Sequence, residues 1–175
     1  HRQELGELKV QGMDYAYNLQ GWLKGINSEA LRSNTDLGGD GVIDDVNQFI
    51  AQDEMGMSLQ YFNEGLDQDY KAIGATQFLA DRTGSNLTSK TAGQSLYNGN
   101  ISNMVTAIGH FMQNGVGPQA MRYQYDQLQR LKSARVEKGF DRNQNTWTNQ
   151  SPDANDYAVD LNYDRNGNID FLKRN

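Results

Sequence analysis

Apolar and polar side chains alternate with a period of two in three short stretches of the chain, and each stretch ends at a tyrosine. The stretches are residues 14–17, 121–125 and 159–163. Because successive residues of a strand point to opposite faces, Tyr15 and Tyr17 are expected to share one face. Tyr123 and Tyr125 are expected to do the same in the second stretch. The alternation predicts a short β-strand in each stretch.

A turn signal follows each of these stretches. Asn18, Asp126 and Asp164 come directly after the last tyrosine, and such a side chain accepts the backbone N–H two residues further on. Gly21 and Gly167 then allow a positive φ at no steric cost, and the Asn-Gly pair that ends at Gly167 is a strong hairpin signal. A second short apolar stretch comes next, so each unit predicts one β-hairpin.

The units are copies of one repeat, aligned on its aromatic residue. The full copies are residues 17–23, 125–131, 140–146 and 163–169, and a shortened copy covers residues 97–101. A single hairpin is marginally stable in water and needs neighbours to support it. The chain therefore predicts a mainly β fold built from repeated hairpins.

A segment of different composition, residues 28–96, separates the first copy from the others. Residues 42–57 carry apolar side chains near helical spacing, with Asp44 and Asp45 near the start, which predicts a short amphipathic helix. We expect short strands over residues 58–62 and 69–73, a surface loop over 80–96, and sheet again over 101–111. This divides the chain into a hairpin region (1–27), an insertion (28–96) and further hairpins (97–175).

Composition narrows the class of function. The 18 glycines, 2 prolines and 9 tyrosines are typical of many turns between short strands, and the formal net charge of −6 argues against a nucleic-acid partner. The lack of cysteine excludes disulfides, and no apolar run approaches the roughly 18 residues that a membrane span needs. His1 is neither an initiator methionine nor the start of a signal peptide, so we expect a processed product or a piece of a longer protein.

A stretch that begins at Asp36 imitates a calcium-binding EF-hand loop. Asp36 and Asp40 stand at positions 1 and 5 of the loop, and a glycine stands at position 6. However, Gly38 replaces a third oxygen ligand, and Asn47 replaces the bidentate carboxylate that closes such loops. The pattern favours an acidic turn without a metal; the alternative is a calcium site formed by Asp36, Asp40 and Asp44.

Catalytic residues are not predicted by any motif in the chain. A nucleophilic triad needs a base close to its nucleophile, and the two histidines are His1, at the terminus, and His110, in an apolar run typical of packed histidines. Residues 84–91 differ from the phosphate-loop pattern at Ser89, where the second glycine belongs. We expect neither an enzyme nor a bound cofactor.

The tyrosine-centred units resemble the YD repeat of rearrangement-hotspot (RHS) proteins. The resemblance rests on residues 13–27 (MDYAYNLQGWLKGIN), 121–131 (MRYQYDQLQRL) and 163–169 (YDRNGNI). It implies a long β-sheet wound into a hollow shell, to which each hairpin adds a piece of wall. In the RHS proteins that this chain resembles, the shell encloses a C-terminal polymorphic toxin and delivers it to competitor cells.

The resemblance also implies where the protein acts and with what. We expect a structural segment of a secreted or cell-surface bacterial protein, whose partners are the rest of the shell and its toxin cargo. Type VI or type IX machinery would export it. Pro118 and Pro152 do not match the motif of the self-cleaving core found in such proteins, so core and toxin are expected outside this sequence. The alternative is an independent calcium-binding adhesion or docking module.

Overall fold

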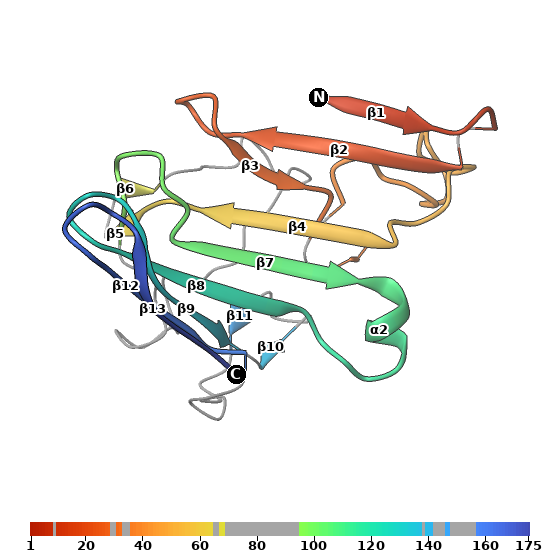
Figure 1. Ribbon diagram of the computed structural model, residues 1–175. Helices are drawn as coiled ribbons and strands as arrows, with labels where there is room; N and C mark the ends of the chain where they lie inside the picture. Colours follow the sequence, from red (N-terminus) through yellow and green to blue (C-terminus); the bar gives the residue numbers. More distant parts are fainter. Residues whose placement is uncertain are drawn as a thin grey trace.

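One antiparallel sheet of nine strands dominates the computed structural model (Figure 1). The structure describes residues 1–8, 10–28, 31–32, 36–64, 67–68, 95–137, 139–141, 146–147 and 157–175. Across the sheet, the strands are β1 (Arg2–Leu5), β2 (Gln11–Tyr17), β3 (Leu23–Ile26), β4 (Met55–Gln60), β7 (Asn103–Ile108), β8 (Gln119–Tyr125), β9 (Leu131–Glu137), β12 (Val159–Tyr163) and β13 (Ile169–Arg174). The predicted mainly β fold is confirmed.

The order of strands in the sheet follows their order in the chain. Each strand pairs antiparallel with the next one in the sheet. Two short ladders lie outside the sheet: β5 (Asn63–Glu64) pairs with β6 (Asp67–Gln68), and β10 (Phe140–Asp141) pairs with β11 (Thr146–Trp147). A sheet of this kind grows by adding one hairpin after another, as the repeats predicted.

The three hairpins β2–β3, β8–β9 and β12–β13 share one register. Tyr17 lies opposite Leu23, Tyr125 opposite Leu131, and Tyr163 opposite Ile169, which is a spacing of six residues in each case. The register shifts by one residue immediately beside each tyrosine, so that the second strand carries one extra residue, a β-bulge. The turns of these hairpins lie at the same end of the sheet (Figure 1).

The side chain that follows the tyrosine closes each turn. One carboxylate or amide oxygen of Asn18, Asp126 and Asp164 accepts the backbone N–H groups two and four residues further on, over 2.8–3.1 Å. The Asn168 side-chain amide also donates to Asp164, over 3.0 Å. The pKa of both carboxyls is lowered by such hydrogen bonds, chiefly that from the Arg130 N–H for Asp126 and that from the Asn168 side chain for Asp164. The charged form is the better acceptor, so both carboxylates stay ionised at neutral pH.

The two faces of the sheet differ in side-chain size. Ala16, Gly25, Ser58, Val105 and Ala120 neighbour one another across five strands and are all buried. On the opposite face, an adjacent row holds larger and only half-buried side chains, namely Tyr15, Ile26, Met57 and Thr106. Buried apolar side chains nevertheless lie on both faces, because Leu59, Ala134 and Val136 share the face of Met57.

The predicted helix over residues 42–57 is wrong. Residues 41–50 form successive turns, and Met55 already belongs to β4. Asp44 takes a positive φ of 68°, which a right-handed helix does not allow. The residues at helical spacing, Val42, Val46, Ile50 and Met55, do not share a buried face, because Ile50 is 7% exposed and Val46 is 92% exposed.

The segment over residues 101–111 is only partly the predicted strand. Strand β7 ends at Ile108, and a short helix, α2 (Gly109–Gln113), follows it at the end of the sheet opposite the hairpin turns (Figure 1). The predicted strand over 58–62 corresponds to β4, which begins earlier, at Met55, and ends at Gln60. The expected strand at 69–73 lies outside the described residues, as does most of the expected loop at 80–96.

Two of the repeat copies depart from the common hairpin. Phe140 lies opposite Trp147, one residue later than the shared spacing of six. The shortened copy is a turn, in which Asn98 accepts the N–H of Asn100 and Gly99 has a φ of 87°. No strand of the described residues starts there, since β7 begins only at Asn103.

The last turn residue of each hairpin has a positive φ, which predicts opposite effects for two exchanges. Gly21 and Gly167 have φ of 79° and 89°, whereas Gln129 takes 62° with a side chain. Gly167→Gln is expected to lower the free energy of unfolding by about 1 kcal/mol, because a Cβ strains this conformation. Gln129→Gly is expected to raise it or leave it unchanged. Urea unfolding of both variants checks this, and equal losses would contradict it.

Candidate functional site

Tyrosine side chains connect neighbouring hairpins of the sheet. Each donates its hydroxyl to a backbone carbonyl of the preceding hairpin: Tyr61 to Leu23 (2.8 Å), Tyr125 to Ile101 (3.0 Å) and Tyr163 to Leu131 (2.7 Å). We call these three residues the interhairpin tyrosines. A bond of this kind fixes one hairpin against the next in addition to the strand ladder.

The accepting carbonyl occupies the same repeat position each time. Leu23 and Leu131 are the first residues of a second strand, directly opposite the tyrosine of their own hairpin. When the strand register is extended to each tyrosine, the residue directly opposite it on the preceding hairpin is the one just before the acceptor. The tyrosine of one hairpin therefore always reaches the turn exit of the hairpin before it.

The residue before the acceptor packs against the tyrosine ring. Trp22 lies 5.0 Å from the Tyr61 ring, centroid to centroid, and the Arg130 guanidinium lies 4.4 Å above the centre of the Tyr163 ring. Ring contacts and cation–π contacts of this kind each add about 0.5–1 kcal/mol. Burial raises the pKa of the Tyr125 phenol, so this hydroxyl keeps its proton and remains a donor.

Tyr61 is an interhairpin tyrosine that the repeat pattern does not reveal. It follows β4, and Phe62 stands where the repeat has Asp or Asn. Its bond to Leu23 makes β4 and β7 a fourth unit of the array, with a long connection in place of the short turn. The alternation that ends at Tyr61 was the available signal.

The other predicted repeat positions have distinct surroundings. Tyr15 is half-buried, and its hydroxyl lies 3.3 Å from the Gln3 side chain; burial raises the pKa of the Tyr123 phenol. Tyr17 is 48% exposed, and its hydroxyl makes no hydrogen bond to a described residue. Gly21, Gly167, Asp126 and Asp164 shape the turns, as described above.

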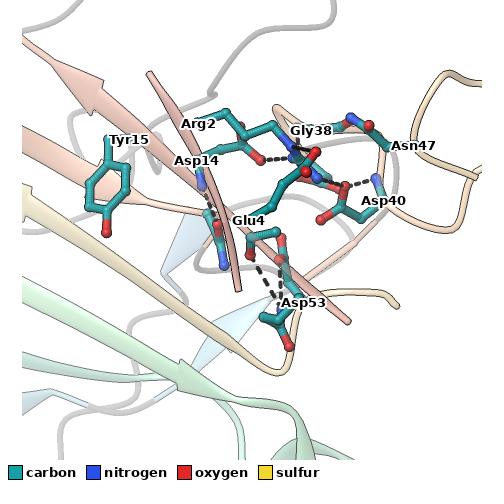
Figure 2. Close-up of polar contacts among 12 residues, drawn as sticks. Arg2, Glu4, Asp14, Tyr15, Gly38, Asp40, Asn47 and Asp53 are labelled. Atoms are coloured by element: carbon teal, nitrogen blue, oxygen red, sulfur yellow. Dashed lines mark hydrogen bonds and ion pairs between the residues drawn. The ribbon is translucent and has the colours of Figure 1, made fainter. Parts of the chain in front are cut away.

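A cluster of charged side chains attaches the first part of the insertion to the edge of the sheet. Arg2, on β1, pairs with Asp14 on β2 and with Asp40 of the insertion, the latter over 2.5 Å (Figure 2). The Asp40 side chain is fully buried. One guanidinium thus joins the edge strand β1 and its neighbour β2 to Asp40 of the insertion.

Glycines leave the space that this ion-pair cluster occupies. A Cβ on Gly38 would collide with Arg2 and Asp14, and a Cβ on Gly12 would collide with Asp40 and Arg2. The absence of a side chain at Gly38, which counts against an EF-hand ligand set, is thus also a packing requirement of the cluster.

The calcium alternative depended on Asp36, Asp40 and Asp44. Asp36 accepts the N–H groups of Gly38 (2.9 Å) and Asp40 (2.7 Å), while Asp44 is exposed to solvent. Asn47 donates to the Gly38 carbonyl over 2.6 Å. Among the residues that the structure describes, no group of three or more acidic or histidine side chains is placed to hold a metal ion.

Asp53 keeps its proton near neutral pH. Burial, followed by the nearby carboxylates of Asp36, Asp40 and Asp14, raises the pKa of Asp53 to about 8. Burial also raises the pKa of Asp14 and of Asp40. The proton on Asp53 reduces the repulsion among these carboxylates.

No family model, curated protein or solved structure matches the chain. The function is therefore argued from the repeat and its contacts. Within the described parts of the chain, no helix is long and apolar enough to cross a membrane.

Removing the hydroxyl of an interhairpin tyrosine is expected to lower the unfolding free energy of the protein. Tyr125→Phe and Tyr163→Phe each delete one hydrogen bond and leave a carbonyl without its donor, so each is expected to cost about 1 kcal/mol of unfolding free energy. Tyr17→Phe is the matched control and is expected to cost much less. Urea unfolding measures all three, and equal effects would show that the hydroxyl bonds do not join the hairpins.

The protonated Asp53 predicts that stability falls as the pH rises. An aspartate has a pKa near 4 in an unfolded chain, so the folded state binds the extra proton between about pH 4 and pH 8. Stability from this group is present below pH 4 and is lost as the pH rises to about 8. Thermal unfolding at pH 5 and pH 9 is expected to show a lower Tm at pH 9.

Asp53→Asn separates this effect from other titrations. The amide stays neutral, so the difference between pH 5 and pH 9 is expected to shrink. An unchanged difference in the Asn variant would assign the pH dependence to other groups.

Proposed function

We propose that this chain is a wall segment of an RHS-type shell, a wound β-sheet that encloses and carries a toxin or effector domain. The role is structural, and the segment has no active site of its own. The partners are the adjoining parts of the shell and the cargo within it. The protein is secreted or displayed at the bacterial surface, with type VI or type IX machinery as the exporter.

The recurring contact between hairpins is the observation that carries this proposal. Three tyrosines in four hairpin units donate to the same position of the preceding unit, within one continuous sheet. Contacts that reach only the nearest unit are typical of repeat architectures that extend in one dimension. A wall of any length can be built from such a unit, and this is what a container requires.

The edges of the sheet support the same role. Strands β1 and β13 each pair on one side only among the described residues, and β13 is exposed along all six residues. Open strand edges favour pairing with further strands. A negative net charge of −6 also suits a large exported protein, because net charge keeps proteins soluble.

The calcium-binding module remains the alternative function, and the ion-pair cluster bears on it. Arg2 donates to Asp40 and to Asp14, so a cation already compensates two of these carboxylates. In a calcium-binding module, the metal would stabilise the folded chain by binding only to it. A rise in Tm of several degrees with calcium would favour the module over the wall segment.

The intact mass of the natural polypeptide tests the proposed function. The sequence accounts for 19.7 kDa. An antibody raised against residues 157–175 would isolate the polypeptide from the source cells for mass spectrometry. A species several times heavier, with a C-terminal domain that resists protease until the protein is unfolded, is the expected result. A monodisperse 19.7 kDa protein would refute the shell.

A further inference from the structure

The exposed edge strand β13 repeats the acceptor side of the contacts between hairpins. Ile169 lies opposite Tyr163 as Leu131 lies opposite Tyr125. Ile169 is therefore the position whose carbonyl would accept the next interhairpin tyrosine. The preceding residue, Asn168, occupies the place that Asn100 has beside Ile101, the acceptor of Tyr125.

Exposure distinguishes β13 from the equivalent strand β9, which has a neighbour. Ala134 of β9, which lies opposite Val159 of β12 in the sheet, is 3% exposed, whereas its counterpart Leu172 of β13 is 60% exposed. Ile169 and Phe171 are 56% and 48% exposed. The edge thus offers both unpaired backbone groups and apolar side chains to an incoming strand.

A charged residue of β9 contacts the neighbouring strand β12, and β13 carries a charged residue at the same repeat position. Arg135 lies ten residues after Tyr125, and its guanidinium contacts Asp160 over 2.5 Å and donates to the Val159 carbonyl over 2.8 Å. Asp160 itself lies three residues before Tyr163. The counterpart of Arg135 on β13 is Lys173, ten residues after Tyr163 and exposed.

We propose that the β13 edge binds an extended segment that ends in tyrosine and carries an acidic residue three positions before it. The segment adds antiparallel to β13, its tyrosine hydroxyl donates to the Ile169 carbonyl, and its acid pairs with Lys173. This specifies the partner of one edge of the proposed wall, and so it rests on the proposed function. The sequence of the chain itself contains the motif three times, at residues 14–17, 67–70 and 160–163.

The direction of the strands argues against a simple stack of two copies. The sheet alternates between strands that end at a tyrosine and strands that begin after a turn, and β1 and β13 are antiparallel to their tyrosine-bearing neighbours β2 and β12. The next strand beside β13 must therefore be of the tyrosine-bearing kind. Strand β1 of a second copy, like β13, is not of the tyrosine-bearing kind, so it does not fit beside β13.

A peptide with residues 157–175 is the probe for this edge. It contains Asp160 and Tyr163, whose partners Arg135 and Leu131 lie outside the peptide, so both are available for a new partner. Fluorescence anisotropy would measure its binding to the 175-residue chain. The Tyr163→Phe peptide is expected to bind about fivefold more weakly, as the loss of one hydrogen bond implies.

Variants of the chain test the charge pair. Lys173→Gln is expected to weaken binding a few-fold, and Lys173→Glu is expected to weaken it further. A peptide with both Asp160→Lys and Lys173→Glu keeps its own cross-strand pair and is expected to restore binding to the Lys173→Glu chain. Arg165→Glu makes the same charge change in the exposed turn and is expected to leave binding unchanged; circular dichroism checks that each variant is folded.

Three results would overturn the inference. They are no binding at millimolar peptide, binding that ignores both Tyr163→Phe and the Lys173 variants, and a dimer of the chain that competes with the peptide. The dimer would assign the edge to a second copy. A heavy natural polypeptide combined with any of these results would leave the proposed function standing and refute the partner alone.

Discussion

The hydrogen bond from a tyrosine hydroxyl to the carbonyl at the exit of the preceding turn is the contact on which the regular arrangement of hairpins depends. A turn exit is a weak point of a sheet, because the bulge interrupts the ladder there and leaves backbone groups that need partners. The hydroxyls of Tyr61, Tyr125 and Tyr163 supply those partners from the next hairpin. The tyrosine of the next hairpin thus supplies a hydrogen bond where the strand ladder is interrupted. The same bond fixes the position of that next hairpin.

The turn and the tyrosine act together to set the register. The side chain after the tyrosine holds two N–H groups of the turn, and this fixes the loop length between Tyr163 and Ile169 and between Tyr125 and Leu131. A slip by one residue would move every side chain to the other face of the sheet. The tyrosine and the turn residue after it are adjacent in the chain. A few residues of each repeat are therefore enough to determine the register of its two strands.

How much could be read from the sequence depended on how local the cause was. The hairpins around Tyr17, Tyr125 and Tyr163 were predictable because alternation, the capping Asn or Asp, and a permissive turn residue all lie within a few positions of one another. Gln129 shows that glycine is not essential, since the cap and the flanking strands hold its φ at 62°.

The errors and omissions came from long-range contacts. Residues 42–57 have helical spacing, but their course is decided by the attachment of Asp40 to Arg2, which lies 38 residues away in the chain. A long-range contact also explains Gly38, which leaves room for Arg2 and Asp14. Its lack of a ligand side chain therefore says little about calcium binding. The contact of Tyr61 with Leu23 spans 38 residues and was not visible in any short motif.

The bulge beside each tyrosine has a consequence for the shape of a longer assembly. In all three hairpins the extra residue stands at the same place of the second strand, where Lys24, Lys132 and Asp170 occur. Bulges bend a strand and increase its twist. A sheet extended by this unit would therefore bend by a similar angle, and in the same direction, at each added hairpin. The backbone of the repeat would then set the radius of such a sheet.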